Sequence, residues 1–321
     1  MKLNSIWQQR TAFSLALPVI AATLFLTQTA CKKNHDNPTP SPATITQTVT
    51  TDTSFSLLAG GLGSAGLTTT LSGPGPFTVF APNNAAFAAS GLTASALASI
   101  PAATLKTILL YHVLPSKVPA AQVPSGPNAK VVTASGDSVF VTNNTNGVFV
   151  NGIKVVKADV AASNGVIHVL AKVLIPPAGN LVQTAQADTN FSYLVAAVTR
   201  ASQGSTNVAA ILSGGGIFTV FAPTNAAFRA AGFATINDIN AADPATLTKI
   251  LTYHVIPGRA FSSDLTDGAK VMTANGESLT ISLSAGAKVK GMTNSTASNI
   301  IATNIMATNG VVHVIDQVLL P

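Results

Sequence analysis

The chain has 321 residues and a formal net charge of +6, and 47% of its residues are hydrophobic while only 9% are charged. This length allows about two domains, and the charged fraction lies far below the roughly 25% of an average globular protein. The lysines are scattered, with no run longer than Lys32-Lys33. No basic stripe that could follow a phosphate backbone is present, so the sequence argues against a nucleic-acid partner.

The first segment, residues 1–30, predicts a secretory signal peptide. It begins with a basic stretch that includes Lys2, and residues 12–26 are apolar. That apolar stretch of about 15 residues is shorter than the roughly 20 that span a bilayer. The only cysteine, Cys31, follows directly and resembles the acylated cysteine of bacterial lipoproteins. An ordinary secretory signal is the alternative, because Gln28 stands where lipoprotein signals usually carry an aliphatic residue.

Residues 31–44 predict a flexible tether that starts at the lipid anchor. The segment is rich in Pro, Asn and Thr and lacks apolar periodicity, which is typical of linkers. We therefore expect an exported protein of the cell envelope, on the outer membrane or cell surface, that contacts the membrane through its lipid anchor only.

Five sequence blocks occur twice, in the same order in both copies. One pair, FTVFAPNNAAF at 77–87 and FTVFAPTNAAF at 218–228, differs at one position and starts 141 residues apart. The other pairs are DTSFSLL (52–58) with DTNFSYL (188–194), LKTILLYHVLP (105–115) with LTKILTYHVIP (247–257), KVVTASGDS (130–138) with KVMTANGES (270–278), and NGVIHVLAKVLIP (164–176) with NGVVHVIDQVLLP (309–321). This period is too long for a solenoid repeat, so we predict two duplicated domains, 45–177 and 178–321.

The first part of each copy predicts helices around one short strand. Asp52 and Asp188 stand where a helix N-cap is expected, before apolar residues spaced i, i+3, i+4 and i+7. The FTVFAP block predicts a short apolar strand that ends at its proline. We expect Asn84 and Asn225 to cap the helix that follows this strand.

The second part of each copy predicts strands. A further helix carries apolar residues at helical spacing as far as His112 or His254 and is ended by a proline. Beyond it the sequence is rich in Val, Ile and Thr, with Asn-Gly and Ser-Gly turns, which favours several short strands. The last strand is apolar on both faces and is therefore expected to be central. Helices followed by strands indicate an α+β fold.

These blocks resemble the signature segments of fasciclin-type (beta-Ig-h3/fasciclin) domains. The resemblance rests on FTVFAPTNAAF, on the Tyr-His pair after a helix and on NGVVHVIDQVLLP. It implies two tandem domains, each a β-sandwich-like wedge packed with several helices, that serve extracellular binding or adhesion and have no conserved catalysis. In this family the Tyr-His region and an Asp-Ile dipeptide before the last strand are linked to adhesion. The corresponding candidate binding residues here are Tyr111, His112, Asp159, Val160, Tyr253, His254, Asn304 and Ile305.

The repeated histidines also suggest a metal site, but core packing is the favoured interpretation. Zinc needs a third cysteine, histidine or carboxylate ligand in each copy, and Asp316 in the last strand has Ala171 as its counterpart. We therefore expect no metal and no cofactor. Hydrolysis is disfavoured because Ser56 and Ser192 lie on helix surfaces by periodicity, and no Gly-x-Ser-x-Gly elbow occurs. The chain has a single glutamate, Glu277, which speaks against the paired carboxylates of a glycosidase.

The sequence thus favours a noncatalytic cell-surface binding module rather than an enzyme. It would mediate cell–cell or cell–matrix adhesion, or bind a surface protein or polysaccharide of unknown identity. The first alternative is an envelope protein that binds a small molecule or a metal, and a hydrolase is less favoured.

Overall fold

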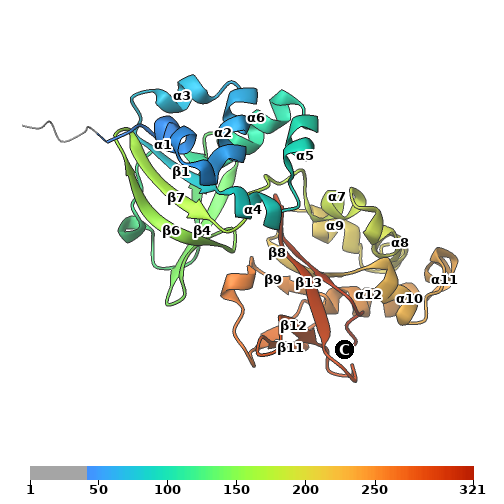
Figure 1. The fold of residues 1–321 in the computed structure, drawn as a ribbon. Coiled ribbons are helices and arrows are strands. Elements are labelled where there is room, and N and C mark those ends of the chain that lie inside the picture. Colours follow the sequence, from blue (N-terminus) through green and yellow to red (C-terminus); the bar gives the residue numbers. More distant parts are fainter. Residues whose placement is uncertain (1–41) are drawn as a thin grey trace, which may run out of the picture. The chain divides into compact units, whose positions relative to one another are not determined.

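The computed structural model describes residues 42–321. The predicted signal peptide, Cys31 and nearly all of the predicted tether lie outside the described residues. No helix among residues 42–321 combines the length and hydropathy required to cross a bilayer. Each sequence repeat forms its own helices and its own seven-stranded sheet, coloured blue to green for the first repeat and yellow to red for the second in Figure 1.

In the first domain, three helices precede the first strand and three follow it. The 3-10 turn Thr53–Phe55 separates the first helix from the second. The helices are α1 (Ile45–Thr51), α2 (Ser56–Ser64), α3 (Thr68–Ser72), α4 (Asn84–Ala89), α5 (Ala94–Ser99) and α6 (Ala102–Tyr111).

The sheet of the first domain has the order β2-β1-β7-β6-β5-β4-β3. Strands β1 and β7 are parallel, and the other neighbouring pairs are antiparallel. The strands are β1 (Phe77–Pro82), β2 (Val113–Leu114), β3 (Gly126–Val132), β4 (Ser138–Asn144), β5 (Gly147–Val150), β6 (Ile153–Ala162) and β7 (Gly165–Leu170).

The second domain repeats this arrangement, with the sheet order β10-β11-β12-β13-β14-β8-β9. Its helices are α7 (Leu181–Gln186), α8 (Ser192–Ala201), α9 (Val208–Ser213), α10 (Asn225–Ala230), α11 (Ile236–Ala241) and α12 (Pro244–Tyr253). Its strands are β8 (Phe218–Pro223), β9 (Val255–Pro257), β10 (Lys270–Met272), β11 (Ser278–Ser282), β12 (Lys288–Lys290), β13 (Ser298–Ala307) and β14 (Gly310–Ile315). The predicted α+β class with two tandem domains is confirmed.

The prediction of a central, two-sided last strand is confirmed. All six residues of β7 and all six of β14 are buried, and each strand lies between two others in its sheet. Alternate side chains of neighbouring β1 serve different cores: Val79 and Ala81 pack beneath the helices. Phe80 packs instead against residues of β4 and β5, such as Val139 and Val150. Each domain therefore has one core under its helices and a second enclosed by its own sheet.

Aspartate caps were predicted correctly, but the asparagine caps were assigned to the wrong helix. Asp52 accepts a hydrogen bond from the Ser54 N–H at 2.9 Å, whereas α4 is capped by Asn83 instead of Asn84. The Asn84 side chain reaches back to α2, where it accepts from the Leu57 N–H at 3.1 Å. It thus satisfies a free donor in the first turn of a helix that has no side-chain cap of its own.

The second domain shows the same displacement. Thr224 caps α10, and Asn225 accepts from the Tyr193 N–H in the first turn of α8 at 3.0 Å. These asparagines hold two helices together, which sequence periodicity could not indicate.

The repeated Asn-Gly dipeptide before the last strand is a buried clamp as well as a turn. The side-chain oxygen of Asn164 accepts from the Ile45 N–H at 2.9 Å, and its side-chain amide donates to the backbone carbonyls of Leu71 and Gly73 at 2.8 Å each. A side chain at Gly165 would collide with the backbone oxygen of Phe77. Close approach, rather than a left-handed φ, therefore requires this glycine.

Asn309 makes the equivalent contacts in the second domain. Its oxygen accepts from the Leu181 N–H at 2.9 Å, and its amide donates to the Leu212 and Gly214 carbonyls at 2.8 and 3.1 Å. The clamp ties the first helix and the end of the third to the central strand.

We predict that Asn309→Ala lowers the unfolding free energy of the second domain by about 2–4 kcal/mol, because buried backbone groups lose their partners. Urea denaturation followed by circular dichroism measures the change. The matched control, Asn237→Ala at an exposed position of α11, should stay within about 0.5 kcal/mol of the parent. An Asn309→Ala effect no larger than that of the control would contradict the clamp.

Candidate functional site

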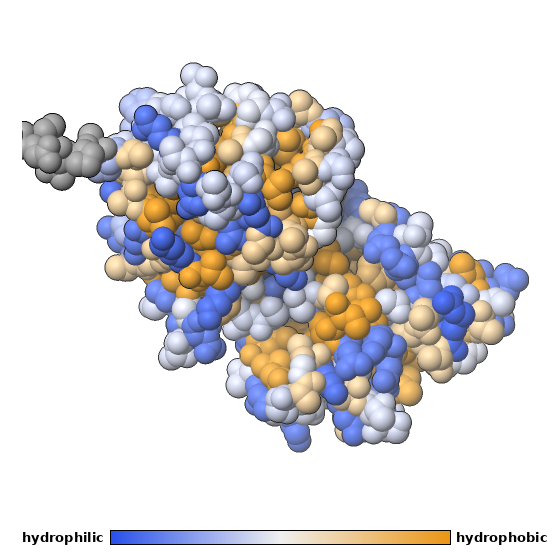
Figure 2. Space-filling view, in the orientation of Figure 1, coloured by the Kyte–Doolittle hydropathy of each residue, from blue (hydrophilic) through white to orange (hydrophobic). Residues whose placement is uncertain are grey.

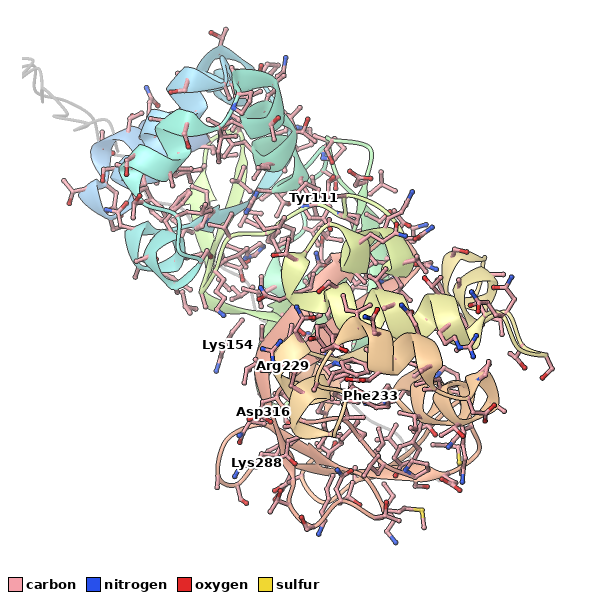
Figure 3. All side chains as sticks on the ribbon, turned by 90° about the vertical axis from the view of Figure 1, so that its right-hand side faces the viewer. Tyr111, Lys154, Arg229, Phe233, Lys288 and Asp316 are labelled. Atoms are coloured by element: carbon pink, nitrogen blue, oxygen red, sulfur yellow. The ribbon has the colours of Figure 1, made fainter. Side chains whose placement is uncertain are left out.

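The candidate tyrosines end helices α6 and α12 and point into the cores enclosed by the sheets. Tyr111, labelled in Figure 3, and Tyr253 are both fully buried. The Tyr111 hydroxyl donates to the Ser138 carbonyl at 3.0 Å and accepts from the Asn151 amide at 2.9 Å. Burial raises the pKa of Tyr111 to about 12. Its hydroxyl therefore stays protonated at neutral pH and acts as a structural tie.

Tyr253 has a corresponding role with a different donor. Its hydroxyl donates to the Ser278 carbonyl at 2.9 Å and accepts from the Met292 backbone N–H at 2.9 Å. Burial also raises the pKa of Tyr253. Both tyrosines thus fasten the end of a helix to two points of the neighbouring sheet.

The adjacent histidines face the other way and clamp the segment after the last strand. His112 Nε2 accepts from the Leu174 N–H at 2.9 Å, so Nδ1 carries the proton and donates to the Ile108 carbonyl at 2.8 Å. His254 makes the same pair of bonds, to Leu319 at 2.9 Å and to Ile250 at 2.8 Å.

The environment of these histidines keeps them neutral. His112 and His254 are 2% and 1% exposed, and burial lowers the pKa of each to about 4. Since both ring nitrogens already have partners, neither is free to bind a metal or to act as a base.

Asp159 and Asn304 occupy equivalent bulges in β6 and β13 and adopt left-handed φ angles of 57° and 64°. Asp159 accepts from the Ala120 N–H at 2.9 Å, and Asn304 accepts from the Ser262 N–H at 2.8 Å. Carboxylate and amide oxygens both accept hydrogen bonds from a backbone N–H. The change from Asp to Asn therefore preserves this loop contact.

The neighbours of these two residues, Val160 and Ile305, are partly buried and pack on the core beneath the helices. Tyr111, His112, Tyr253 and His254 are buried as well, so Asp159 is the one exposed member of the eight candidate residues. Val160, Asn304 and Ile305 are partly exposed, so these three and Asp159 are the candidates that a partner could reach, and a binding role for the eight residues remains a prediction.

The other repeated histidines also hold loops. His168 Nδ1 accepts from the Asp159 N–H at 3.2 Å, and its Nε2 donates to the Val118 carbonyl at 2.9 Å. His313 Nε2 donates to the Ala260 carbonyl at 2.9 Å, and burial lowers the pKa of His313. The two rings thus connect the last strand to the loop that follows the Tyr-His block.

Groups suited to catalysis or metal binding are held in structural contacts. Between residues 42 and 321 no three His, Cys, Asp or Glu side chains gather in a way that could hold a metal ion. The repeated serines contact asparagine: Ser56 lies 3.0 Å from the Asn84 amide, and Ser192 lies 3.0 Å from the Asn225 amide. These contacts do not form a nucleophile–base pair.

Sequence reasoning missed a set of exposed apolar side chains at equivalent strand positions of both domains. Val132 and Met272 precede the turn to the next strand and are 57% and 59% exposed. Val156 in β6 and Ile301 in β13 also occupy equivalent positions of the two sheets, and they are 54% and 57% exposed. Figure 2 shows apolar patches between pale, weakly polar areas on the surfaces of both domains. Aligning the two repeats position by position could have revealed these residues.

The comparisons with known proteins agree with this architecture. The fasciclin domain model matches residues 53–176 and again residues 189–321. The chain belongs to the fasciclin-domain family.

Relatives of known sequence include animal and bacterial proteins. The chain is 30% identical over 256 residues to transforming growth factor-beta-induced protein ig-h3 of Sus scrofa, covering 78% of this chain and 35% of that protein. It is 40% identical over 169 residues to protein sll1483 of Synechocystis, covering 52% of this chain and 92% of that protein. It is 41% identical over 107 residues to the cell surface glycolipoprotein MPB83 of Mycobacterium bovis, covering 33% of this chain and 45% of that protein.

Among solved structures, the chain is similar to a FAS1 domain pair from the insect cell adhesion molecule fasciclin I. The TM-score is 0.40 at 19% sequence identity, over 86% of this chain and 96% of that one. The chain spans about a third of the length of the animal protein ig-h3 that it matches.

We predict that acid destabilises the domains through their neutral histidines. His254 has a folded pKa of about 4 and a reference value of 6.5, so the unfolded chain takes up its proton first as the pH falls. Its contribution to stability is complete above pH 6.5 and is lost between pH 6.5 and 4, at up to about 1.4 kcal/mol per pH unit. Urea midpoints of the second domain at pH 7 and pH 5 measure this loss.

The variant His254→Gln separates the titration from other effects of acid. At pH 7 it should be less stable than the parent by about 1–3 kcal/mol, because the Leu319 N–H loses its acceptor. Between pH 7 and pH 5, however, it should lose less stability than the parent does. Parallel pH profiles of the parent and the variant would rule out the neutral histidine clamp.

Proposed function

We propose that this chain is an exported, lipid-anchored adhesion protein of the cell envelope that binds a surface protein or polysaccharide without catalysis. Its membership of the fasciclin-domain family supports the adhesion role. One bacterial relative is a cell surface glycolipoprotein, which is in keeping with acylation at Cys31.

The observation that carries the proposal is the repeated exposure of apolar side chains. Val132 and Val156 in the first domain have exposed apolar counterparts, Met272 and Ile301, in the second. Scattered single apolar side chains are normal on a protein surface. The same positions exposed in two diverged copies are harder to attribute to chance, and apolar side chains supply much of the energy of protein contacts.

The composition of the surface favours contacts that depend weakly on salt. Only 9% of the residues are charged, and the one ion pair within the described part of the chain, Lys249–Glu277, is 3.9 Å long and exposed. Exposed charge pairs contribute little and are screened by salt. A partner would therefore be held through apolar, hydroxyl and amide groups, and two similar domains would add avidity where both can engage.

Adhesion of coated beads tests the proposal. Beads that carry residues 42–321 should be retained on surfaces coated with outer-membrane protein or with surface polysaccharide from the source cells. Retention should persist in EDTA and change little between roughly 0.05 and 0.5 M salt, a range that includes the concentration of about 0.1 M at which the screening length is about 10 Å. Counting retained beads under flow gives the result.

Substitutions on the repeated positions provide the matched comparison. Replacing Val132, Val156, Met272 and Ile301 together by Thr should reduce retention roughly tenfold or more, since the loss of even one residue that dominates binding costs about 2 kcal/mol. Ile211→Thr with Ile217→Thr, at exposed positions elsewhere, should leave retention unchanged. Undiminished retention of the fourfold variant, or no retention of the parent on either coating, would refute the proposal.

The anchor has its own test. Replacing Cys31 by Ser in the expressed full chain should abolish acylation and move the protein from the membrane pellet to the soluble fraction, because a stable anchor needs its acyl chains. Immunoblots of fractionated cells and mass spectrometry of the mature N-terminus record the outcome. A Cys31→Ser protein that still sediments with membranes would show that anchoring does not depend on this residue.

A further inference from the structure

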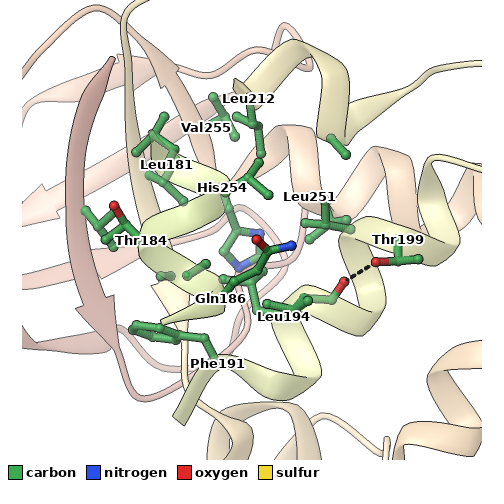
Figure 4. A pocket seen from close by; sticks show the side chains of 18 residues that line it. Leu181, Thr184, Gln186, Phe191, Leu194, Thr199, Leu212, Leu251, His254 and Val255 are labelled. Carbon is green, nitrogen blue, oxygen red and sulfur yellow. Dashed lines mark hydrogen bonds between the residues drawn. The ribbon is translucent and has the colours of Figure 1, made fainter. Parts of the chain in front are cut away.

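The second domain contains an apolar cavity of about 90 Å³ between its helices and its sheet. Figure 4 shows leucine side chains around His254, with Gln186 and Thr199 on the helices α7 and α8 that line the cavity. The walls come from α7, α8, α9 and α12 and from strands β8 and β14. The leucines that line it are Leu181, Leu194, Leu212 and Leu251.

The cavity offers no charge and no free polar group in its interior. None of its lining residues is Asp, Glu, Lys or Arg. Both nitrogens of His254 are already hydrogen-bonded, the Thr184 hydroxyl donates to the Asn180 carbonyl at 2.9 Å, and the Thr199 hydroxyl donates to the Val195 carbonyl at 2.8 Å. A cavity without two to four polar partners for a water stays dry and accepts apolar ligands.

Smaller side chains in the second repeat create this space. Ala185 on α7 stands where the first domain has Val49, and Val198 on α8 stands where it has Leu62. Val49 and Leu62 are 1% and 4% exposed and belong to the first domain's core.

Two further wall positions follow the same trend. Val312 replaces Ile167 in the central strand, and Ala209 replaces Thr68 in the third helix. The duplicated frame is unchanged, but the second copy has smaller side chains at these four wall positions, whereas Val195 is larger than its counterpart Ala59.

The cavity opens to solvent between α7 and α8. Ala185 and Val198 are partly exposed although their counterparts in the first domain are buried, and the adjacent Gln186 and Thr199 are exposed. The side-chain amide of Gln186 can hydrogen-bond a polar group of a ligand that extends out of the mouth.

We propose that this cavity binds the end of an unbranched fatty acyl chain, with the polar head of the ligand outside near Gln186. The volume is smaller than the roughly 150 Å³ of an apolar cavity that takes up benzene, which favours a narrow chain over a ring. The uncharged walls favour methylene groups, and the open mouth allows the remainder of the acyl chain to extend into solvent. Adhesion through the outer strand positions does not depend on this site.

Methyl NMR titration of residues 42–321, which contain all described helices and strands, tests the proposal with octan-1-ol, decan-1-ol and decanoate. Methyl signals of Leu181, Leu194 and Leu251 should shift in a saturable way. Affinity should rise roughly fourfold for each methylene that enters the cavity, as expected from about 0.8 kcal/mol per buried CH₂, and should level off when the cavity is full.

The decisive variant transfers the residues of the first domain into the second. Ala185→Val with Val198→Leu should fill the cavity, weaken binding roughly tenfold or more and raise the melting temperature. Ala210→Val, the same kind of change at an exposed position of α9 outside the cavity, should bind like the parent. If the filled variant proves unstable, Val49→Ala with Leu62→Val supplies the reverse test, because it should create chain binding in the first domain.

A parallel titration with phosphatidylcholine vesicles shows whether the acyl chain comes from a free ligand or from a membrane lipid. Binding of free decanoate without vesicle binding supports a free fatty acid or ester as ligand, and shifts of the same leucine methyls with vesicles support a lipid chain in a membrane. Equal binding by the parent and the filled variant, uptake of benzene without uptake of any alkyl chain, or no saturable shift with any probe would overturn the proposal.

Discussion

The burial of both faces of the central strand determines the architecture of each domain. Because all residues of β7 and β14 are enclosed, one face requires a layer of helices and the other requires the rest of the sheet to fold over it. The helix ends and the C-terminal segment that pack around this strand then contain buried backbone groups that need partners. Asn164 and His112 supply them in the first domain, and Asn309 and His254 supply them in the second.

This constraint explains why the residues shared by the two repeats hold the fold together and do not form a reactive site. These structural residues are called the frame below. Tyrosine ties a helix to the sheet, histidine holds the final segment, and asparagine joins the first helix to the central strand. Each of these side chains makes its full set of hydrogen bonds within its own domain. The functional differences are therefore expected where the frame tolerates change, on the exposed strand positions and at the helix–sheet junction that opens a cavity in the second domain.

Much of the frame could be predicted from the sequence, because duplication showed which positions matter and apolar periodicity showed how they fold. The aspartate caps and the two-sided strand follow from local pattern alone. Asn84 was assigned to the wrong helix because its true partner, Leu57, lies 27 residues away. The cavity was also beyond prediction: Ala185 and Val198 are visibly small, but only the fold shows that they line one space.

Native-state hydrogen exchange of the Leu174 and Leu319 amides most directly tests whether the Tyr-His blocks have a structural role. These N–H groups bond to His112 and His254, so the account predicts that they exchange only by global unfolding of their domains. Binding of a surface partner should leave this protection unchanged. Fast exchange in the free protein that slows when a partner binds would contradict the account, because the Tyr-His segments would then open to form the contact themselves.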